Sequence, residues 1–356
     1  MTQTPDNATS SRPARSTQVR MAARPVGEPD DSVFELVETD LPELAEGQVL
    51  LRTVYLSLDP YMRGRMSDAK SYAAPWQVGD VMQGATVCEV VESRSERRAP
   101  GDLVLAYTGW QTHAVVDARH MRSIDPAAAP ISTAVGVLGM PGFTAYAGLL
   151  QIGRPQPGET VVVAAATGPV GSAVGQVAKV KGARAVGIAG GEEKCRALTE
   201  ELGFDAAVDH RSPTFREDLA AATPDGIDVY FENVGGPVFE AVARRLNKFA
   251  RIPVCGLVAN YNATSAPEGP DRLPGFMNKV LTLSLTVRGF IQDEFVAEHE
   301  ADFQREMAAW VADGSVRYRE HVARGLENAP EAFRGMLSGR NFGKTLVQVG
   351  DDPTQA

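Results

Sequence analysis

The sequence predicts an α/β protein in which a β-rich domain is joined to a domain built on a doubly wound parallel sheet. Short β-type runs separated by glycines fill residues 19–125. From about residue 158, short apolar strands alternate with helical segments, and this alternation is typical of a parallel sheet covered by helices. A last strand-like run, Lys344–Val349, closes the chain. If this strand returns to the first domain, the parallel-sheet domain is an insertion.

Composition and charge narrow the class of protein. The 356 residues include 44% hydrophobic and 22% charged side chains, which is typical of a soluble globular chain long enough for two domains. The net charge of −10 argues against non-specific nucleic-acid binding and against anionic membranes, because both require a positive field. No apolar run approaches the roughly 18 residues that span a bilayer. We therefore expect neither nucleic acid nor membrane as a partner.

The N-terminus and the cysteines point to an intracellular protein. Residues 1–18 contain scattered Thr, Ser, Pro and Arg without an apolar core, so we predict a disordered tail and no secretory signal. Cys88, Cys195 and Cys255 lie far apart, which makes a poor disulfide framework and favours reduced thiols in the cytoplasm. The five histidines are also dispersed, and no Cys/His pair has the spacing of metal ligands. We predict no metal site.

The β-rich part shows three clear strands with turn signals between them. These strands are expected at Val49–Tyr55, Ala85–Val91 and Asp102–Tyr107. Short strands with this spacing, without helices between them, predict a small barrel-like or sandwich domain.

The second part begins with a strand that is apolar throughout. Thr160–Ala165 is expected to be buried on both faces, and a helix with apolar residues at helical spacing follows it. A second strand at Ala185–Ala189 precedes a helix that ends near Gly203. Further strands are predicted at Ala206–Val208, Asp228–Phe231, Ala250–Cys255 and Leu281–Phe290, with a long amphipathic segment at Phe295–Trp310. Pro253 cannot donate to a neighbouring strand, so we expect a bulge there.

The turn Ala165–Gly171 has the form of a phosphate-binding turn, since it follows a strand and opens a helix. Gly168 allows the backbone to approach a diphosphate, and Gly171 allows the helix to pack close to the sheet. The helix N-terminus offers free N–H groups and partial positive charge. Pro169 suits the first helical turn but removes one donor. Gly168, Pro169, Val170 and Gly171 are the candidate contacts; the alternative is a tight turn that binds nothing.

The end of the second strand favours NADPH over NADH. NAD sites usually place an acid there to hold the ribose hydroxyls. Here the strand ends at Gly190-Gly191, which leaves room for a 2′-phosphate, and Lys194 follows about one helical turn later. Two alternatives remain: Glu192 serves as the NAD acid, or Lys194 is a solvated surface charge.

Several segments together resemble one known family. They are Leu58–Arg63, Gly139–Tyr146, the turn Ala165–Gly171, Phe231–Gly236, Cys255–Gly256 with Tyr261–Asn262, and Asn341–Thr345. These segments resemble the leukotriene/prostaglandin reductases and alkenal double-bond reductases. This zinc-free branch of the medium-chain dehydrogenases/reductases includes bacterial curcumin reductase. The resemblance extends from about residue 19 to residue 349.

The resemblance implies a fold, a reaction and an assembly. It implies a GroES-like domain at 19–145 and 325–356, a Rossmann NADPH-binding domain at 146–324, and a cofactor cleft between them. It implies NADPH-dependent reduction of a carbon–carbon double bond conjugated to a carbonyl, and usually a homodimer.

The resemblance also assigns cofactor contacts. Gly168–Gly171 would hold the diphosphate, Lys194 the 2′-phosphate, and Asn233 would lie near the ribose or nicotinamide. The rest of the cleft would be lined by Cys255, Gly256, Tyr261, Phe290, Ile291, Gln292 and Asn341. The family commonly has tyrosine where this chain has His210. Histidine can donate to the phosphate and Arg211 adds charge, but cofactor affinity would then depend more on pH.

Reduction of an enone requires a hydrogen-bond donor at the carbonyl oxygen, where enolate charge develops. Tyr261 is the first candidate and Tyr61, from the other domain, the second, although either can be an amphipathic core residue. The sequence names no general acid, so the α-carbon proton is expected from solvent. Asp59, Asp80 and Glu89 lie among strands and turns and are expected to be exposed.

Three other functions remain open at this point. A quinone reductase on the same scaffold would share the cofactor site and differ in the substrate pocket. A zinc alcohol dehydrogenase would require one stoichiometric metal ion. A regulatory protein that binds NADPH without catalysis would show no turnover. The chain contains no Gly-x-Ser-x-Gly elbow, Walker loop or His-Glu-x-x-His helix.

Overall fold

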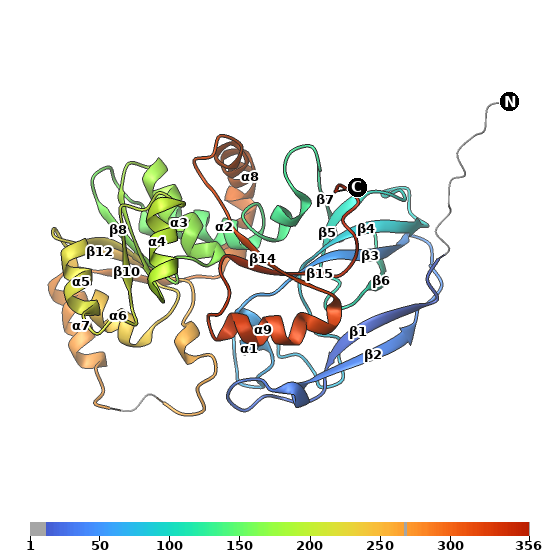
Figure 1. The fold of residues 1–356 in the computed structure, drawn as a ribbon, viewed down its shortest axis with the longest axis horizontal. Helices are drawn as coiled ribbons and strands as arrows, with labels where there is room; N and C mark the ends of the chain where they lie inside the picture. The colour runs from blue at the N-terminus through green and yellow to red at the C-terminus, as the bar shows by residue number, and fades with distance from the viewer. Residues whose placement is uncertain (1–11, 267–268, 356) are drawn as a thin grey trace.

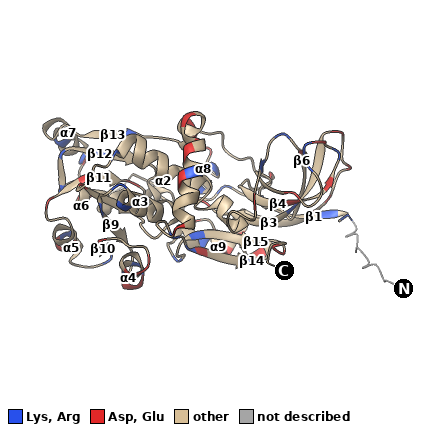
Figure 2. Cartoon of the chain, turned by 90° about the horizontal axis from the view of Figure 1, so that it is seen from above, with Lys and Arg blue, Asp and Glu red and all other residues tan. Residues whose placement is uncertain are grey.

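The computed structural model describes residues 12–266 and 269–355. Within them the chain forms a six-stranded sheet and a seven-stranded sheet that lie side by side, together with a separate two-stranded ribbon (Figure 1). Charged side chains of both signs are spread over the peripheral helices and loops, while the sheets are mostly uncharged (Figure 2). No helix in the described ranges is long and apolar enough to cross a membrane.

The seven-stranded sheet is built from both ends of the chain. Its order is β14-β15-β3-β4-β5-β7, and β6 also pairs with β3. The strands are β3 (Gln48–Ser57), β4 (Thr86–Ser93), β5 (Leu103–Ala106), β6 (His113–Asp117), β7 (Arg122–Ser123), β14 (Glu320–Arg324) and β15 (Lys344–Gln348). The short helices α1 (Tyr61–Arg65) and α9 (Ala329–Leu337) accompany it. Because β15 pairs antiparallel with β3, the chain end returns to the first sheet as the sequence suggested.

The ribbon corrects the N-terminal prediction. Strand β1 (Arg15–Met21) pairs antiparallel with β2 (Phe34–Asp40). The predicted tail is therefore wrong for residues 15–18, whose backbone is hydrogen-bonded to a neighbouring strand, whereas residues 1–11 lie outside the described ranges. Likewise, β14 already belongs to the seven-stranded sheet, so the C-terminal part of that sheet starts before the expected boundary at residue 325. The division into two domains otherwise stays a prediction.

The six-stranded sheet is parallel throughout, with the order β10-β9-β8-β11-β12-β13. Its strands are β8 (Thr160–Ala164), β9 (Arg184–Ala189), β10 (Ala206–Asp209), β11 (Ile227–Phe231), β12 (Leu246–Val254) and β13 (Thr286–Gly289). The order reverses between β8 and β11, and ligands bind at such a switch point in doubly wound sheets.

Helices cover both faces of this sheet, which explains why β8 is apolar throughout. They are α2 (Met140–Ala147), α3 (Pro169–Val180), α4 (Glu192–Glu200), α5 (Phe215–Ala222), α6 (Gly236–Val242), α7 (Leu273–Thr282) and α8 (Val296–Ala312). Val161 and Val163 pack into the core beneath α2, α3 and α8, whereas Val162 packs into the core beneath α5 and α6. A strand with a core on each side has no face for polar residues.

Two predictions about individual strands are wrong. The segment Leu281–Phe290 is not all strand: α7 continues to Thr282, and β13 covers only Thr286–Gly289. Phe276, Val280 and Leu283 pack at helical spacing against the core, and this packing overrides the alternating pattern. The bulge expected at Pro253 lies instead between Leu246 and Arg251, where Phe249 has φ 67°. Pro253 keeps its place in β12 because its carbonyl accepts from Glu232 N at 3.0 Å.

Candidate active site

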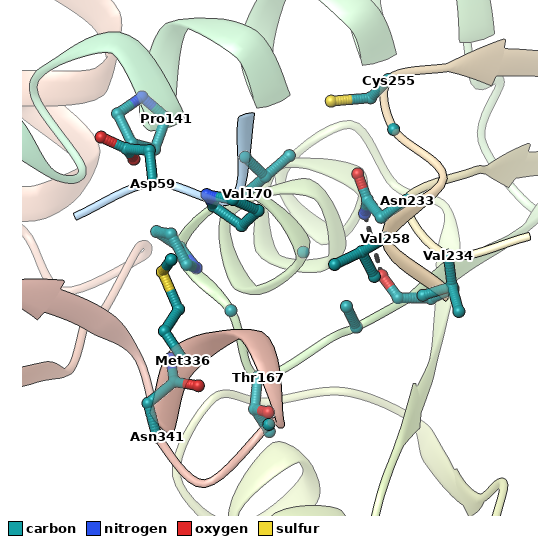
Figure 3. A pocket seen from close by; sticks show the side chains of 18 of the residues that line it. Asp59, Pro141, Thr167, Val170, Asn233, Val234, Cys255, Val258, Met336 and Asn341 are labelled. Atoms are coloured by element: carbon teal, nitrogen blue, oxygen red, sulfur yellow. Dashed lines mark hydrogen bonds between the residues drawn. The ribbon is translucent and has the colours of Figure 1, made fainter. Parts of the chain in front are cut away.

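The main cavity, of about 510 Å³, lies at the carboxyl ends of the parallel strands, where it meets the first domain. The structure brings the candidate NADPH contacts and both candidate tyrosines from the sequence to this one cavity. They are Tyr61, Gly168, Pro169, Val170, Gly171, Lys194, His210, Asn233, Cys255, Gly256, Tyr261, Phe290, Ile291, Gln292 and Asn341. Asn233, Val258 and Cys255 form one wall, and Asp59, Pro141 and Met336 face them (Figure 3).

The turn between β8 and α3 brings backbone close to the cavity. Helix α3 begins at Pro169 with Gly168 as its N-cap, and Gly168 N donates to Ala165 O at 2.9 Å. Ala165 itself has φ 51°, a left-handed conformation that is rare for a non-glycine residue and that clusters at ligand sites. A Cβ on Gly171 would lie 2.4 Å from Ala165 O. Gly171 is therefore required for this approach of helix to strand.

At the tip of β9, three basic side chains meet where an NAD site would have an acid. Gly190 is in close contact with them, since an added Cβ would lie 2.8 Å from both His210 Nε2 and Arg211 Nε. Lys194 lines the same end and donates from Nζ to Gly339 O at 2.8 Å. Glu192 and Glu193 are exposed, and neither is among the described residues that line the cavity. The geometry thus favours an anion over ribose hydroxyls at this position.

Charge repulsion and burial act on the protonation of these groups. Burial, together with Arg211, lowers the pKa of His210 and the pKa of Lys194 below their usual values. Asp209 does not neutralise the cluster fully, because its Oδ1 accepts from the backbone N–H groups of Gly191 and Arg211, each at 2.9 Å. Two basic side chains, Lys194 and Arg211, together with the imidazole of His210 as a further hydrogen-bonding group, suit a phosphate.

The opposite end of the cavity is formed by the segments after β11 and β12. Asn233 Nδ2 donates to Ala164 O at 2.9 Å, which ties the end of β11 to the end of β8. Gly256 leaves room for a tyrosine, because a Cβ there would lie 3.1 Å from Tyr261 Oη. The Cys255 side chain points into the cavity (Figure 3), and burial raises the pKa of its thiol to about 12. The thiol is neutral at physiological pH.

Both candidate tyrosines keep their protons. Burial and the neighbouring Asp59 raise the pKa of Tyr61, and burial raises the pKa of Tyr261. A protonated phenol can donate a hydrogen bond to an oxygen that becomes negative. Tyr72 lines the same end of the cavity and was not predicted, since no motif surrounds it in the sequence.

Asp59 corrects the expectation that it is exposed. Its side chain is 5% exposed, and its Oδ1 accepts from Lys344 Nζ at 2.7 Å. Lys344 Nζ also donates to Leu58 O at 2.6 Å. This pair ties the turn that carries Tyr61 to the start of β15. Of the other two carboxylates, Glu89 is half-buried and pairs with Arg52, and Asp80 is exposed as expected.

Other residues of the cavity wall were not named as site candidates. They are Leu58, Pro60, Thr167, Met336, Leu337, Ser338, Gly339 and Thr345. Of these, Leu58, Pro60, Thr167 and Thr345 lie in segments that were singled out from the sequence. Gly343 N donates to Thr167 O at 3.0 Å, so the segment between α9 and β15 lies directly against the phosphate turn. These segments are more than 150 residues apart in sequence, and no local pattern connects them.

Comparison with known proteins agrees with this geometry. A family model for the N-terminal domain of oxidoreductases matches residues 17–124, and one for zinc-binding dehydrogenases matches residues 169–313. The NADPH-dependent curcumin reductase of Escherichia coli is 55% identical over 333 residues, which cover 93% of this chain and 96% of the relative. The chain belongs to the curcumin and prostaglandin reductase family of medium-chain dehydrogenases/reductases.

Two further members of this reductase family extend the comparison. Prostaglandin reductase 1 of Sus scrofa is 41% identical over 328 residues, covering 91% of this chain and 96% of that protein. The crystal structure of CurA in complex with NADPH from Vibrio vulnificus has 53% identity and a TM-score of 0.91. It covers 95% of this chain and all of that chain. The resemblance drawn from the motifs, with its GroES-like and Rossmann parts, is thus confirmed.

The second family model is that of zinc-binding dehydrogenases. In residues 12–266 and 269–355, no group of three or more His, Cys, Asp or Glu side chains could hold a metal ion. Asp59, the carboxylate that lines the cleft, is already bonded to Lys344 and to the Ser57 hydroxyl.

Proposed function

We propose that the cleft binds NADPH along its length and holds an α,β-unsaturated aldehyde or ketone beside Tyr261. The enzyme is an NADPH-dependent oxidoreductase that reduces carbon–carbon double bonds conjugated to a carbonyl. The observation that carries the assignment is the convergence of the phosphate turn, the basic tip of β9 and Tyr261 on one cavity.

The residues of the cleft fit NADPH from end to end. The diphosphate would lie at the N-terminus of α3, where backbone N–H groups and the helix dipole favour an anion. The 2′-phosphate would meet Lys194, His210 and Arg211. The nicotinamide half would lie between Asn233 and the segment Cys255–Tyr261, with Phe290, Ile291, Gln292 and Asn341 completing the wall.

When bound, NADPH supplies the hydride for the β-carbon of the substrate. Tyr261 donates a hydrogen bond to the carbonyl oxygen, and this bond strengthens as enolate charge develops. Because burial raises the pKa of Tyr261, the phenol remains a donor at neutral pH. Met140, Pro141 and Phe290 surround the site with apolar surface and exclude water from the reacting carbon. The proton for the α-carbon comes from solvent.

The test is NADPH oxidation against a short alkenal, a long conjugated enone and a quinone. We expect turnover of both conjugated carbonyl compounds and a lower rate with the quinone. A faster quinone reaction would support the quinone reductase alternative. Tight NADPH binding without turnover of any member of the panel would support a regulatory protein.

Lys194→Ala should raise the NADPH dissociation constant about 10- to 100-fold, because a hydrogen bond between charged groups contributes about 1.5–3 kcal/mol. NADH binding should remain essentially unchanged, since NADH has no 2′-phosphate. Fluorescence titration of the nicotinamide measures both constants. Glu193→Ala, a neighbouring exposed position outside the cavity, is the matched control. An undiminished preference of Lys194→Ala for NADPH would exclude Lys194 as the 2′-phosphate contact.

NADPH should bind more weakly at pH 8 than at pH 6. Burial and Arg211 lower the pKa of His210 in the free protein, and a 2′-phosphate dianion beside the imidazole should raise it. Binding then takes up a proton, so affinity falls as pH rises between these values, by up to tenfold per pH unit for one proton. His210→Gln keeps a hydrogen-bond donor that does not titrate. The pH dependence of NADPH affinity that remains in this variant comes from the 2′-phosphate, and the difference from the wild type comes from His210. Identical pH profiles for the two proteins would contradict this role.

We also propose a homodimer that forms through the edge of the six-stranded sheet. The edge strand β13 has all four residues exposed, and unpaired strand edges pair readily with a second chain. On the neighbouring helix α7, Leu273, Met277 and Leu281 expose 60%, 53% and 78% of their surface at a spacing of four residues. Sedimentation equilibrium should give twice the mass of one chain, and a monomer would exclude the proposal.

We place the enzyme in the cytoplasm on the basis of its cysteines. Cys88, Cys195 and Cys255 are free thiols, and Cys255 lines the cofactor cleft. Such thiols persist in a reducing compartment. Cell fractionation measures this directly, and recovery outside the cytoplasm would refute it.

A further inference from the structure

A buried carboxyl group lies directly beneath the nicotinamide end of the cleft. Glu232 follows β11 and is 1% exposed. Its Oε1 accepts hydrogen bonds from Val234 N at 2.6 Å, Gly235 N at 2.9 Å and Tyr230 Oη at 3.1 Å. Its Oε2 has no hydrogen-bond partner, and no cation pairs with the carboxyl group, among the residues that the structure describes. A buried carboxyl with one unpaired oxygen costs folding free energy, so it needs an explanation.

Glu232 holds the turn that leads from β11 into α6. Gly235 and Gly236 have φ of 78° and 57°, so two successive residues adopt positive φ values that favour glycine. In this turn the N–H groups of Val234 and Gly235 converge on one point, as in the backbone nests that bind anions. The Glu232 carboxyl occupies that point. The turn carries Asn233, whose side chain reaches Ala164 O at the switch point.

The same turn holds the second cleft segment in place. Cys255 N and Gly256 N donate to Glu232 O at 2.9 and 3.2 Å. Val258 N then donates to Asn233 O at 3.1 Å, and Ala259 N to Val234 O at 3.0 Å.

These hydrogen bonds fix the 3₁₀ turn Val258–Asn260, and Tyr261 is the residue that directly follows this turn. Tyr261 N donates to Val258 O at 3.3 Å, and the Tyr261 hydroxyl lies over Gly256. A continuous path of short contacts therefore joins the Glu232 carboxyl to the Tyr261 hydroxyl.

We propose that Glu232 is a positioning residue that sets the location of the Tyr261 hydroxyl and of Asn233 in the cleft. This proposal rests on the proposed function, because it assumes that Tyr261 faces the substrate. Glu232 does not line the cavity, so it acts through the backbone of the two segments and touches neither substrate nor cofactor. Burying Oε2 without a partner costs folding free energy. The hydrogen bonds that Oε1 accepts from Val234 N and Gly235 N offset this cost by holding the turn in its conformation.

The protonation state of Glu232 should matter for this role. Burial raises the pKa of Glu232, although the Val234 and Gly235 N–H groups act in the opposite direction. The titratable groups that face it are Tyr230 on β11 and Cys255 after β12, and both are neutral at physiological pH. The ionised carboxylate accepts the two backbone N–H groups more strongly than the neutral acid does. Protonation should therefore loosen the turn as pH falls through the raised pKa.

The experiment compares Glu232→Ala, Glu232→Gln and Tyr230→Phe. Glu232→Ala removes the acceptor, so kcat with an enone should fall about 100-fold, as expected for a displacement near 1 Å at the reacting centre. Glu232→Gln keeps one oxygen for the two N–H groups and should restore most of kcat. Its kcat should no longer fall at acidic pH. Tyr230→Phe removes only the third bond and should behave like the wild type.

Binding and stability measurements separate positioning from a merely structural role. Glu232→Ala should weaken NADPH, measured by nicotinamide fluorescence, but should leave 2′,5′-ADP affinity unchanged, because that fragment occupies only the adenosine end. A raised pKa means that ionisation of Glu232 costs stability, and this cost is present above that pKa. Glu232→Gln should therefore not lower the melting temperature at pH 8.

Several results would overturn the proposal. One is a folded Glu232→Ala protein with unchanged kcat and NADPH affinity. Another is an equal loss of NADPH and 2′,5′-ADP binding, which would indicate general damage. If Glu232→Ala does not fold, the test is the pH profile of kcat for Glu232→Gln. A profile identical to that of the wild type would contradict the positioning role of Glu232. Failure of the proposed function itself looks different: the wild type would then turn over no enone, while the binding results could still hold.

Discussion

Replacement of Lys344 by methionine should lower the free energy of unfolding by about 3–5 kcal/mol, because it leaves a buried carboxylate without its partner. The Lys344 and Asp59 side chains are 3% and 5% exposed, and Nζ lies 2.7 Å from Asp59 Oδ1. The carbonyl of Leu58 would also lose its donor. Methionine has nearly the length of lysine, so the loss reports the charge and hydrogen bonds more than packing. Urea unfolding monitored by circular dichroism measures it.

The matched control removes the stranded charge. Lys344→Met combined with Asp59→Asn should recover part of the lost stability, because no uncompensated carboxylate then remains at the pair. Glu320 lies opposite Lys344 in the register of β14 and β15, and burial raises its pKa, so it does not replace Asp59 as the main partner. Exposed ion pairs contribute less than about 1 kcal/mol to the free energy of unfolding. If Lys344→Met alone lowers that free energy by less than this amount, the pair is not acting as a buried one.

Tyr261→Phe should lower kcat for enone reduction by about 100- to 1,000-fold, the effect of removing one donor from the oxygen that becomes negative. Ground-state binding should change little, because the hydrogen bond strengthens only as the enolate forms. NADPH affinity should also stay close to that of the wild type. Single-turnover measurement of NADPH oxidation separates the chemical step from product release.

Tyr61→Phe and Tyr72→Phe are the matched controls, since both side chains line the same cavity and lose the same hydroxyl. We expect smaller effects on kcat from each. If Tyr61→Phe shows the large loss and Tyr261→Phe keeps kcat within a few-fold of the wild type, the donor role passes to Tyr61 and the arrangement around Glu232 loses its catalytic purpose. Large losses in both would mean that two hydroxyls share the oxygen.

Local patterns predicted much of the parallel sheet and named residues that the structure brings together at the cleft. The apolar run of β8 predicted a strand with a core on both faces, and Gly171 predicted a helix that packs closely against that strand. The glycines at the tip of β9 marked a position without an acid, where His210 and Arg211 now lie against Gly190. Each of these signals is carried by residues whose neighbours are close in sequence.

Predictions failed where partners were distant or patterns competed. Asp59 looked exposed because its partner Lys344 is 285 residues away. The expected tail contains residues that become β1 only by pairing with β2, and Leu281–Leu285 alternates like a strand although its neighbours pack as a helix. Phe249, rather than Pro253, carries the bulge, since Pro253 can still accept through its carbonyl.

The sequence by itself predicted the apolar strands of the parallel sheet and the glycine turn before α3, because these depend on periodicity and on glycine placement along a short stretch. Its motifs indicated the family by resemblance. Only the tertiary structure decided that Lys344 pairs with Asp59, that Lys194 donates to Gly339, and that the buried Glu232 accepts from Val234 and Gly235. The physical reason is that burial and charge pairing are properties of groups brought together by folding. Their energies depend on distance and desolvation in space, and the linear order of residues contains neither.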